Sequence, residues 1–320
     1  MARRERSLAR IPHNASGSNR FPRIHGHRGA RGVRPENTLE SILAAVRLGC
    51  DAVEVDLWIS ADDRLIVHHD PRISRAIARG PDGTWGADGP PIRGCSTADL
   101  KRYDVGRMNP GSRYAARFPD QVPCDGSRIP TLAEVARLLD GLDTDIELNL
   151  ELKSAPGNRS LMPPAERVID IAARELETLR IVDRAFVQSF DWRLPLGVKS
   201  RLPDVRIGLL SDQNGEFGIP AGQTGGGSDG KISKARIRQE DLPERVHELG
   251  AEVWSPNALD IDADTLETAR RAGLEVCVWT VNSERDMLDM LDLGVDAITT
   301  DYPERLIALR AERNDPGPPG

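Results

Sequence analysis

Aromatic residues and long apolar runs are scarce in this sequence. Phenylalanine, tryptophan and tyrosine make up 4% of the 320 residues, so aliphatic side chains must build the core. No apolar run approaches the roughly 18 residues of a membrane-spanning helix. The basic start at residues 1–20 is not followed by an apolar segment, which a secretory signal would require. The sequence therefore predicts no transmembrane segment, and we expect a cytoplasmic protein.

Metal-ligand cysteine pairs and an excess of basic charge are also missing. The four cysteines are scattered along the chain without the spacing of zinc-binding pairs. Lysine and arginine number 43 against 50 aspartate and glutamate residues, which leaves a formal charge of -7. A nucleic-acid partner would need a basic face, so this charge balance argues against one. The sequence carries no signal for an oligomeric state.

From residue 23 onward, short β-rich segments alternate with amphipathic helical segments, as in a parallel sheet covered by helices. We predict eight strands, at residues 23–27, 52–60, 145–153, 185–190, 206–211, 252–256, 275–281 and 296–300. We predict helices at residues 38–49, 163–179, 262–273, 283–294 and 303–313, with N-caps at Thr38, Asp262 and Ser283. No Gly-rich dinucleotide fingerprint follows the first strand, so a TIM-type (β/α)8 barrel is favoured over a doubly wound sheet.

The chain divides into a barrel at residues 23–312, a disordered N-terminal arm at 1–22 and a flexible tail at 313–320. Residues 72–130 are rich in Gly, Pro, Arg and Asp, and we expect them to form a small insertion after the second strand. The insertion should stand over the substrate end of the barrel; the alternative is a stabilising cap. Residues 212–231 are either a mobile loop on the same rim or an unconstrained surface excursion.

Acidic residues alternate with apolar ones in the second and third predicted strands. Glu54 and Asp56 share one face of a strand, and Glu151 follows near the same end of the next. Carboxylates this close inside a barrel repel one another and lose hydration, and a bound cation resolves that conflict. All-oxygen ligands select a hard divalent ion, Mg²⁺ or Ca²⁺. The alternative is a set of interior ion pairs, for instance between Lys153 and a carboxylate.

Two histidines accompany these carboxylates. His27 ends the first predicted strand, and His69 follows the second. A lone strand histidine is more often a hydrogen-bonded core residue than a catalyst, but the neighbouring carboxylates favour catalysis. Histidine titrates near neutrality, so His27 and His69 suit proton transfer to and from the oxygens of a phosphodiester. Arg28 and Lys153 are cations suited to the phosphate oxygens.

These segments resemble the glycerophosphodiester phosphodiesterase family. The run HRGARGVRPENTLESILAA at residues 27–45 resembles the family's opening signature, and EVDLWISADDRLIVHHDP at 54–71 resembles its continuation. Further matches are IPTLAEV (129–135), LNLELK (148–153), FVQSFD (186–191), WTVN (279–282) and VDAITTDYP (295–303). The similarity covers residues 23 to 310 in the expected order. His25 departs from it, because the family usually has an apolar residue there.

The resemblance implies a barrel with a small insertion and assigns roles to individual residues. It implies metal ligands at Glu54, Asp56 and Glu151 and acid/base histidines at His27 and His69. Phosphate-contacting positions are Arg28 and Lys153, and Trp279 matches a residue that packs against the glycerol. Glu36 and Asn37 are expected to support the ligands or orient the substrate.

The implied function is metal-dependent hydrolysis of a small-molecule glycerophosphodiester to an alcohol and glycerol 3-phosphate. A cytoplasmic setting favours Mg²⁺, and export would favour Ca²⁺. One alternative is a phospholipase D-type enzyme of related architecture that acts on lysophospholipids, although the polar insertion counts against a lipid-facing groove. The other is a non-catalytic binding protein on the same barrel, but no histidine or carboxylate of the site is missing.

Overall fold

The computed structural model describes residues 21–142, 144–212 and 239–314. Eight parallel strands form the predicted barrel: β1 (Arg23–Gly26), β2 (Ala52–Ile59), β4 (Glu147–Leu152), β5 (Ala185–Ser189), β6 (Arg206–Ser211), β7 (Val253–Pro256), β8 (Glu275–Val278) and β9 (Ala297–Thr300). Because β1 pairs with both β2 and β9, the sheet closes on itself. Residues 1–20 of the predicted arm, 213–231 of the predicted loop and 315–320 of the predicted tail lie outside the described residues.

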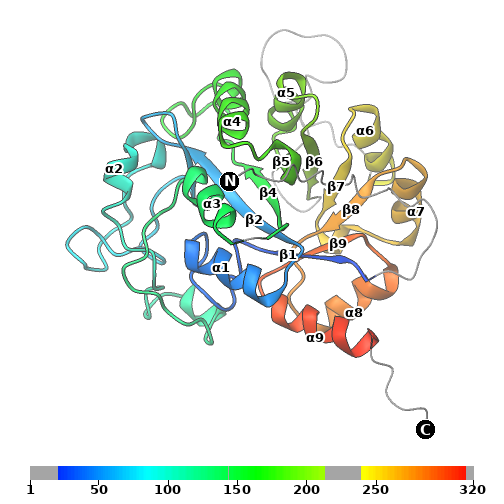
Figure 1. Ribbon diagram of the computed structural model, residues 1–320, viewed down its shortest axis with the longest axis horizontal. Helices are drawn as coiled ribbons and strands as arrows, with labels where there is room; N and C mark the ends of the chain where they lie inside the picture. Colours follow the sequence, from blue (N-terminus) through cyan, green and yellow to red (C-terminus); the bar gives the residue numbers. More distant parts are fainter. Residues whose placement is uncertain (1–20, 143, 213–238, 315–320) are drawn as a thin grey trace, which may run out of the picture.

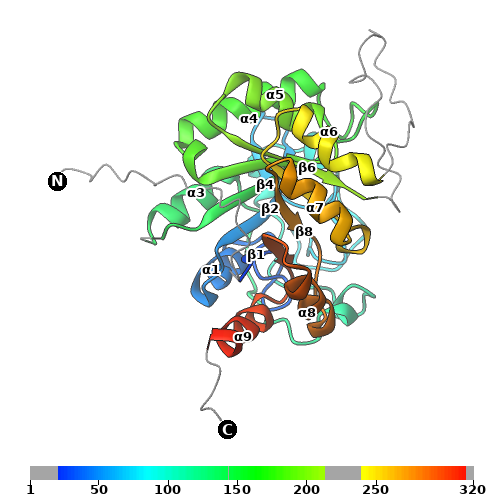
Figure 2. The same ribbon diagram turned by 90° about the vertical axis from the view of Figure 1, so that its right-hand side faces the viewer.

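Helices surround the strands (Figure 1). They are α1 (Leu39–Leu48), α3 (Leu132–Asp140), α4 (Ala165–Leu179), α5 (Arg193–Arg201), α6 (Leu242–Glu248), α7 (Ala263–Arg271), α8 (Glu284–Leu293) and α9 (Pro303–Asn314). Turned by 90°, the structure has α4, α5 and α6 above the strands and α8 and α9 below them (Figure 2). Short 3-10 segments are η3 (Val182–Arg184), η5 (Gln239–Asp241) and η6 (Ala258–Asp260). No helix within the described ranges combines the length and hydropathy that crossing a membrane requires.

The five predicted helices correspond to α1, α4, α7, α8 and α9. The predicted N-caps are confirmed: the side chains of Thr38, Asp262 and Ser283 each accept a hydrogen bond from a backbone N–H in the first turn of the helix that follows. The sequence analysis did not predict α3, α5 or α6. Pro195 and Gly197 interrupt the helical signal of α5, and α6 is a helix of seven residues.

A short strand, β3 (Leu65–Val67), turns back antiparallel to β2. Its three residues carry too short a pattern to be predicted as a strand. The hairpin returns the chain to the end of β2, where the backbone N–H of His68 donates to the carbonyl of Asp56 at 3.0 Å. The predicted insertion lies between β3 and α3 and contains η1 (Ile92–Gly94), α2 (Thr97–Leu100) and η2 (Ala115–Arg117).

The floor of the barrel is closed by charge. The first residues of four alternate strands, Arg23, Glu147, Arg206 and Glu275, form ion pairs with one another, with Arg206 2.6 Å from Glu147 and 2.5 Å from Glu275. A buried apolar layer of Phe186, Val253, Cys277 and Ala297 also fills the barrel. Polar groups of the barrel that face substrate must therefore lie at the carboxyl ends of the strands, as in other TIM barrels.

Candidate active site

Three buried carboxylates meet at the carboxyl ends of β2 and β4. Alternation turns Glu54 and Asp56 to the same side of β2, and the strand register places Asp56 beside Glu151. One oxygen from each of the three residues lies within 4.8 Å of the others. The structure therefore brings together the three residues that the sequence analysis assigned to a metal.

Lys153 offsets part of this negative charge. Its Nζ lies 2.7 Å from Asp56 Oδ1 and 2.6 Å from Glu151 Oε1, so the ion pairs considered as an alternative to a metal are present. Burial opposes ionisation of Asp56, but Lys153 and Arg28 outweigh it and lower the pKa of Asp56 well below its usual range. Lys153 does not make such a pair with Glu54.

Lys153 and Arg28 neutralise the negative charge of Glu54 less than that of Asp56. Burial, together with the negative charges of Asp56 and Glu151, raises the pKa of Glu54 well above its usual range. Its Oε1 is buried and has no hydrogen-bond partner among the residues that the structure describes. A hard cation would supply the missing positive charge, and the all-oxygen donor set fits Mg²⁺ or Ca²⁺. The residues present therefore fit the predicted ion.

The loop between β1 and α1 supplies most of the remaining contacts to the carboxylates. The backbone N–H of Arg28 donates to Glu54 Oε2 at 2.8 Å, and the Arg28 side chain donates to Glu36 Oε1 at 2.9 Å. Arg28 Nε lies 3.2 Å from Asp56 Oδ2, to which Asn37 Nδ2 donates at 2.7 Å. Arg28 and Asn37 have φ values of 52° and 55°, so the loop holds two non-glycine residues in the left-handed region.

His27 stands between this cluster and a buried aspartate. Its Nδ1 is 2.7 Å from Asp301 Oδ1, and its Nε2 is 3.8 Å from Glu54 Oε2. Burial and the neighbouring Arg31 lower the pKa of His27 to about 4, against the opposing effect of Asp301. The surroundings of His27 therefore favour its neutral form, and Nε2 faces the carboxylate cluster.

His69 lies in the loop that follows β3 and is the more open of the two histidines. Its side chain is 35% exposed, compared with 13% for His27. Its Nδ1 lies 2.7 Å from Asp70 Oδ1, and its carbonyl accepts a hydrogen bond from Trp58 Nε1 at 2.8 Å. The two histidines thus each have a carboxylate partner at Nδ1.

Trp279 follows β8 on another part of the rim. Its ring meets Phe190 edge-on, with 5.4 Å between the ring centroids, and its Nε1 donates to the carbonyl of Ser255 at 2.9 Å. Phe190 follows β5, so this aromatic pair joins the ends of two strands. The sequence analysis named Trp279 but did not recognise Phe190 as its partner.

Asp301 is the main residue of the site that the sequence analysis missed. It follows β9, is completely buried, and contacts His27, Arg31 and Asn282. The sequence did contain a signal that could have identified Asp301: it lies in the run VDAITTDYP, directly after the last predicted strand. A polar residue at the carboxyl end of a barrel strand is a candidate for chemistry on that ground alone.

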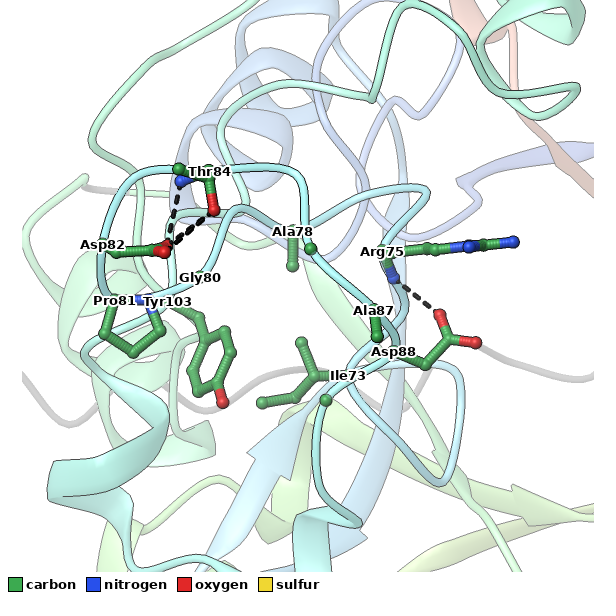
Figure 3. A pocket seen from close by; sticks show the side chains of 12 residues that line it. Ile73, Arg75, Ala78, Gly80, Pro81, Asp82, Thr84, Ala87, Asp88 and Tyr103 are labelled. Atoms are coloured by element: carbon green, nitrogen blue, oxygen red, sulfur yellow. Dashed lines mark hydrogen bonds between the residues drawn. The ribbon is translucent and has the colours of Figure 1, made fainter.

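A separate cavity of about 260 Å³ lies within the insertion. Figure 3 shows Tyr103, Pro81 and Ile73 around it, while the side chain of Arg75 points away. Its lining comes from residues 73–89 and Tyr103, and none of the predicted site residues belongs to it. The carboxylate cluster at the ends of β2 and β4, rather than this cavity, is therefore the candidate active site.

Known proteins resemble this chain over most of its length. The profile of the glycerophosphoryl diester phosphodiesterase family matches residues 27–305. A glycerophosphodiester phosphodiesterase of Caldanaerobacter subterraneus is 29% identical over 289 residues, which cover 89% of this chain and 96% of the relative. A putative glycerophosphoryl diester phosphodiesterase from Silicibacter pomeroyi superposes with a TM-score of 0.80 at 31% identity, covering 93% of this chain and 96% of the other. A phosphodiesterase from Oleispira antarctica, solved with the product sn-glycerol-3-phosphate, has a TM-score of 0.66 at 25% identity, covering 91% and 97%.

Proposed function

The chain belongs to the glycerophosphoryl diester phosphodiesterase family, and we propose that it hydrolyses glycerophosphodiesters to an alcohol and glycerol 3-phosphate with one divalent cation. The observation that carries this proposal is the position of His27 Nε2, 3.8 Å from Glu54 Oε2, beside three buried carboxylates. Displacement at phosphorus needs a proton acceptor next to a site of positive charge. The relative from Oleispira antarctica, solved with the product sn-glycerol-3-phosphate, supports glycerol 3-phosphate as one of the two products.

We assign the two histidines opposite roles in proton transfer. His27 Nε2 takes the proton from the attacking hydroxyl as that oxygen bonds to phosphorus. The hydroxyl belongs to water, or to the glycerol itself; in the second case a cyclic phosphate forms, and water must then open it to give glycerol 3-phosphate. His69 gives a proton to the alcohol oxygen as the bond between that oxygen and phosphorus breaks. Asp301 and Asp70, each 2.7 Å from a histidine Nδ1, stabilise positive charge on the rings during these transfers.

Glu54, Asp56 and Glu151 are the proposed ligands of the cation, for which we favour Mg²⁺ over Ca²⁺. The bound ion supplies positive charge that offsets the carboxylates and attracts the phosphate oxygens. Arg28 and Lys153 are the cationic side chains beside these carboxylates, and we assign them to the remaining phosphate oxygens.

Three further residues take supporting roles in this proposal. Glu36 holds the guanidinium of Arg28, and Asn37 holds Asp56 through its side-chain amide. Trp279, backed by Phe190, offers an aromatic face for the glycerol. These contacts orient the groups that touch the substrate.

The test is an assay of the purified protein on glycerophosphocholine with Mg²⁺, with Ca²⁺ and with excess chelator. We expect activity that chelation abolishes and that one of the two ions restores. His27→Ala and His69→Ala should each lower kcat by about 10²-fold or more. His247→Ala is the matched control, because His247 is an exposed histidine on α6.

A lysophospholipid assayed in parallel separates the phospholipase D-type alternative. A higher kcat/KM on the lysophospholipid than on glycerophosphocholine would favour the phospholipase D-type activity over hydrolysis of small glycerophosphodiesters. Full activity in excess chelator would contradict the cation, and binding without hydrolysis of either substrate would indicate a non-catalytic barrel.

A further inference from the structure

The tautomer of His27 is set by Asp301. Burial opposes ionisation of Asp301, but His27 and Arg31 outweigh it and hold the pKa of Asp301 well below its usual range. Two groups compete for Nδ1 of His27: Asp301 Oδ1 at 2.7 Å, which can only accept, and a terminal nitrogen of Arg31 at 3.2 Å, which can only donate. The shorter contact, with the ionised carboxylate, favours the proton on Nδ1. Nε2, the nitrogen that faces Glu54, is then left with its lone pair. The orientation of Asp301 therefore decides whether His27 can accept a proton.

Asp301 is itself fixed from two sides. Arg31 donates to both of its oxygens, from Nε to Oδ1 at 2.7 Å and from a terminal nitrogen to Oδ2 at 2.8 Å. Asn282 donates to Oδ2 at 2.8 Å and accepts from the Asp301 backbone N–H at 2.9 Å. A forked arginine–carboxylate pair fixes both distance and plane, which a single contact does not.

Arg31 belongs to the loop between β1 and α1, and the insertion holds it there. The centre of its guanidinium lies 4.9 Å from the centroid of the Phe118 ring, in the geometry of a cation–π contact. Its carbonyl accepts a hydrogen bond from Gln121 Nε2 at 2.7 Å, and the next residue but one, Val33, accepts from the Val122 N–H at 3.0 Å. The insertion therefore contacts this loop in three ways: through the Phe118 ring, through the side-chain amide of Gln121 and through the backbone of Val122.

Phe118 is fixed within this contact. It is 3% exposed, and its ring lies 5.3 Å from that of Tyr114 in the insertion and 6.4 Å from that of Tyr302, next to Asp301. Tyr302 also donates to the carbonyl of Arg117 at 3.3 Å. The insertion and the end of β9 thus enclose Arg31 between them.

We propose that Phe118 and Arg31 are positioning residues through which the insertion holds Asp301 and, with it, the reactive tautomer of His27. This inference rests on the proposed function, in which His27 accepts the proton. It gives the insertion a role other than selecting the alcohol or capping the barrel. Loss of the Phe118 ring should loosen Arg31, tilt Asp301 and admit the other tautomer of His27, without touching a cation ligand.

The experiment compares Phe118→Leu, Arg31→Met and Arg31→Lys with the parent enzyme. Arg31→Met should lower kcat by about 10-fold or more and Phe118→Leu by about 3-fold or more, with KM within about 2-fold, since misplacing a catalytic group costs rate rather than substrate binding. Arg31→Lys keeps the charge without the fork and should recover only part of the loss. Arg117→Met is the matched control: Arg117 also stacks on Phe118, at 5.5 Å, but it is exposed.

Two readouts separate positioning from general damage. Long-range ¹⁵N–¹H NMR of the His27 ring should report the Nδ1–H tautomer in the parent and a mixture in Arg31→Met and Phe118→Leu. Calorimetric titration of Mg²⁺ should give a Kd within about 2-fold of the parent, because neither residue touches the carboxylate ligands. A variant that fails to fold is replaced by the other, and Phe118→Leu is the milder change.

The outcomes distinguish this inference from the function on which it rests. Parent-like kcat and tautomer in Phe118→Leu and Arg31→Met, with His27→Ala inactive, would overturn the positioning role and leave the proposed function standing. A parent without hydrolase activity would refute the proposed function. An altered His27 tautomer in the variants would still support the positioning role of Phe118 and Arg31.

Discussion

At Glu54, burial and neighbouring negative charge act in the same direction. Both favour the protonated acid, and the cations nearby pair with Asp56 and Glu151 instead. A protonated Glu54 would be a poor ligand, so cation binding and release of a proton from Glu54 should be linked. We therefore expect the protonation of Glu54 to depend on whether the proposed cation is bound.

Replacing Glu54 by glutamine tests this coupling. Glu54→Gln removes the charge and keeps the shape, so affinity for Mg²⁺ should fall by about 10-fold or more while the free energy of unfolding without the ion stays equal or rises. Calorimetric titration and urea denaturation measure the two quantities. Unchanged Mg²⁺ affinity together with full activity would remove Glu54 from the ligand set. Glu248→Gln, an exposed residue of α6, is the control.

His25 predicts a pH dependence of stability. It is buried against Phe186 and Cys277, and burial, with the positive charges of Arg23 and Arg206, lowers its pKa well below the usual value. The unfolded chain binds a proton near pH 6.5 and the folded chain does not. Stability contributed by neutral His25 is therefore present above pH 6.5 and is lost as the pH falls below it.

The measurement is urea denaturation of the parent and of His25→Leu between pH 5 and 8. The parent should lose up to about 1.4 kcal/mol more per pH unit below pH 6.5 than the variant does. The control is His247→Gln, at an exposed position. Parallel curves for parent and His25→Leu would show that His25 does not titrate differently on unfolding.

The sequence predicted the carboxylate cluster and missed what holds His27. Strand alternation fixes the face of Glu54 and Asp56, and the order of parallel strands puts Glu151 at the same height, so local patterns were enough. Asp301 meets His27 across 274 residues of chain, because β9 closes the barrel beside β1. Arg31 and Phe118 meet through the packing of an irregular insertion, which no periodicity describes.

At the scale of elements, the start of α1 supports the active site. Thr38 caps this helix by accepting from the Ser41 N–H, and the preceding residue, Asn37, donates to Asp56. A frayed first turn would move the Asn37 amide. The helix therefore carries a contact to the proposed cation site as well as packing energy.

Thr38→Ala should lower the free energy of unfolding by about 1 kcal/mol and weaken Mg²⁺ binding. The control is Ser283→Ala, which removes the corresponding cap of α8. It should cost similar stability and leave Mg²⁺ affinity unchanged. Equal losses of Mg²⁺ affinity in Thr38→Ala and Ser283→Ala would mean that the start of α1 does not support the cation site in particular. Urea denaturation and calorimetry measure the two effects.

Except for α3, the elements that the sequence analysis missed are short or carry helix breakers; α3 has nine residues with buried positions at helical spacing, and the analysis overlooked that pattern. The prediction of α1, α4, α7, α8 and α9 rested on amphipathic periodicity, and three of their N-caps were identified from single residues. β3 has only three residues, and its pairing with β2 depends on a turn rather than on a hydrophobic pattern. Proline and glycine in α5 conceal a helix that packing against α4 stabilises.

At the scale of the whole molecule, the ion pairs of the floor and the chemistry of the rim lie at opposite ends of the strands. Glu275→Gln leaves part of the charge of Arg206 and Arg23 unpaired, so the free energy of unfolding should fall by about 1–3 kcal/mol, less than for a fully buried pair. The kcat should stay within about 2-fold of the parent, because distant sites contribute independently.

The exposed pair of Arg285 and Asp289 on α8 provides the comparison. Arg285→Gln should change stability by less than about 0.5 kcal/mol, because solvent screens an exposed ion pair. A large loss of kcat in Glu275→Gln, with the fold retained, would contradict the separation of floor and rim. Thermal unfolding and steady-state kinetics provide the measurements.

The closed lower end of the barrel also bears on how the substrate enters and how the products leave. Ion pairs and an apolar layer block the lower end of the barrel, so in the proposed reaction we expect the diester to enter and both products to leave at the rim. Glycerol 3-phosphate that stays bound at the proposed cation site would exclude the next substrate. Inhibition by glycerol 3-phosphate should therefore be competitive with the diester, and turnover should slow as that product accumulates.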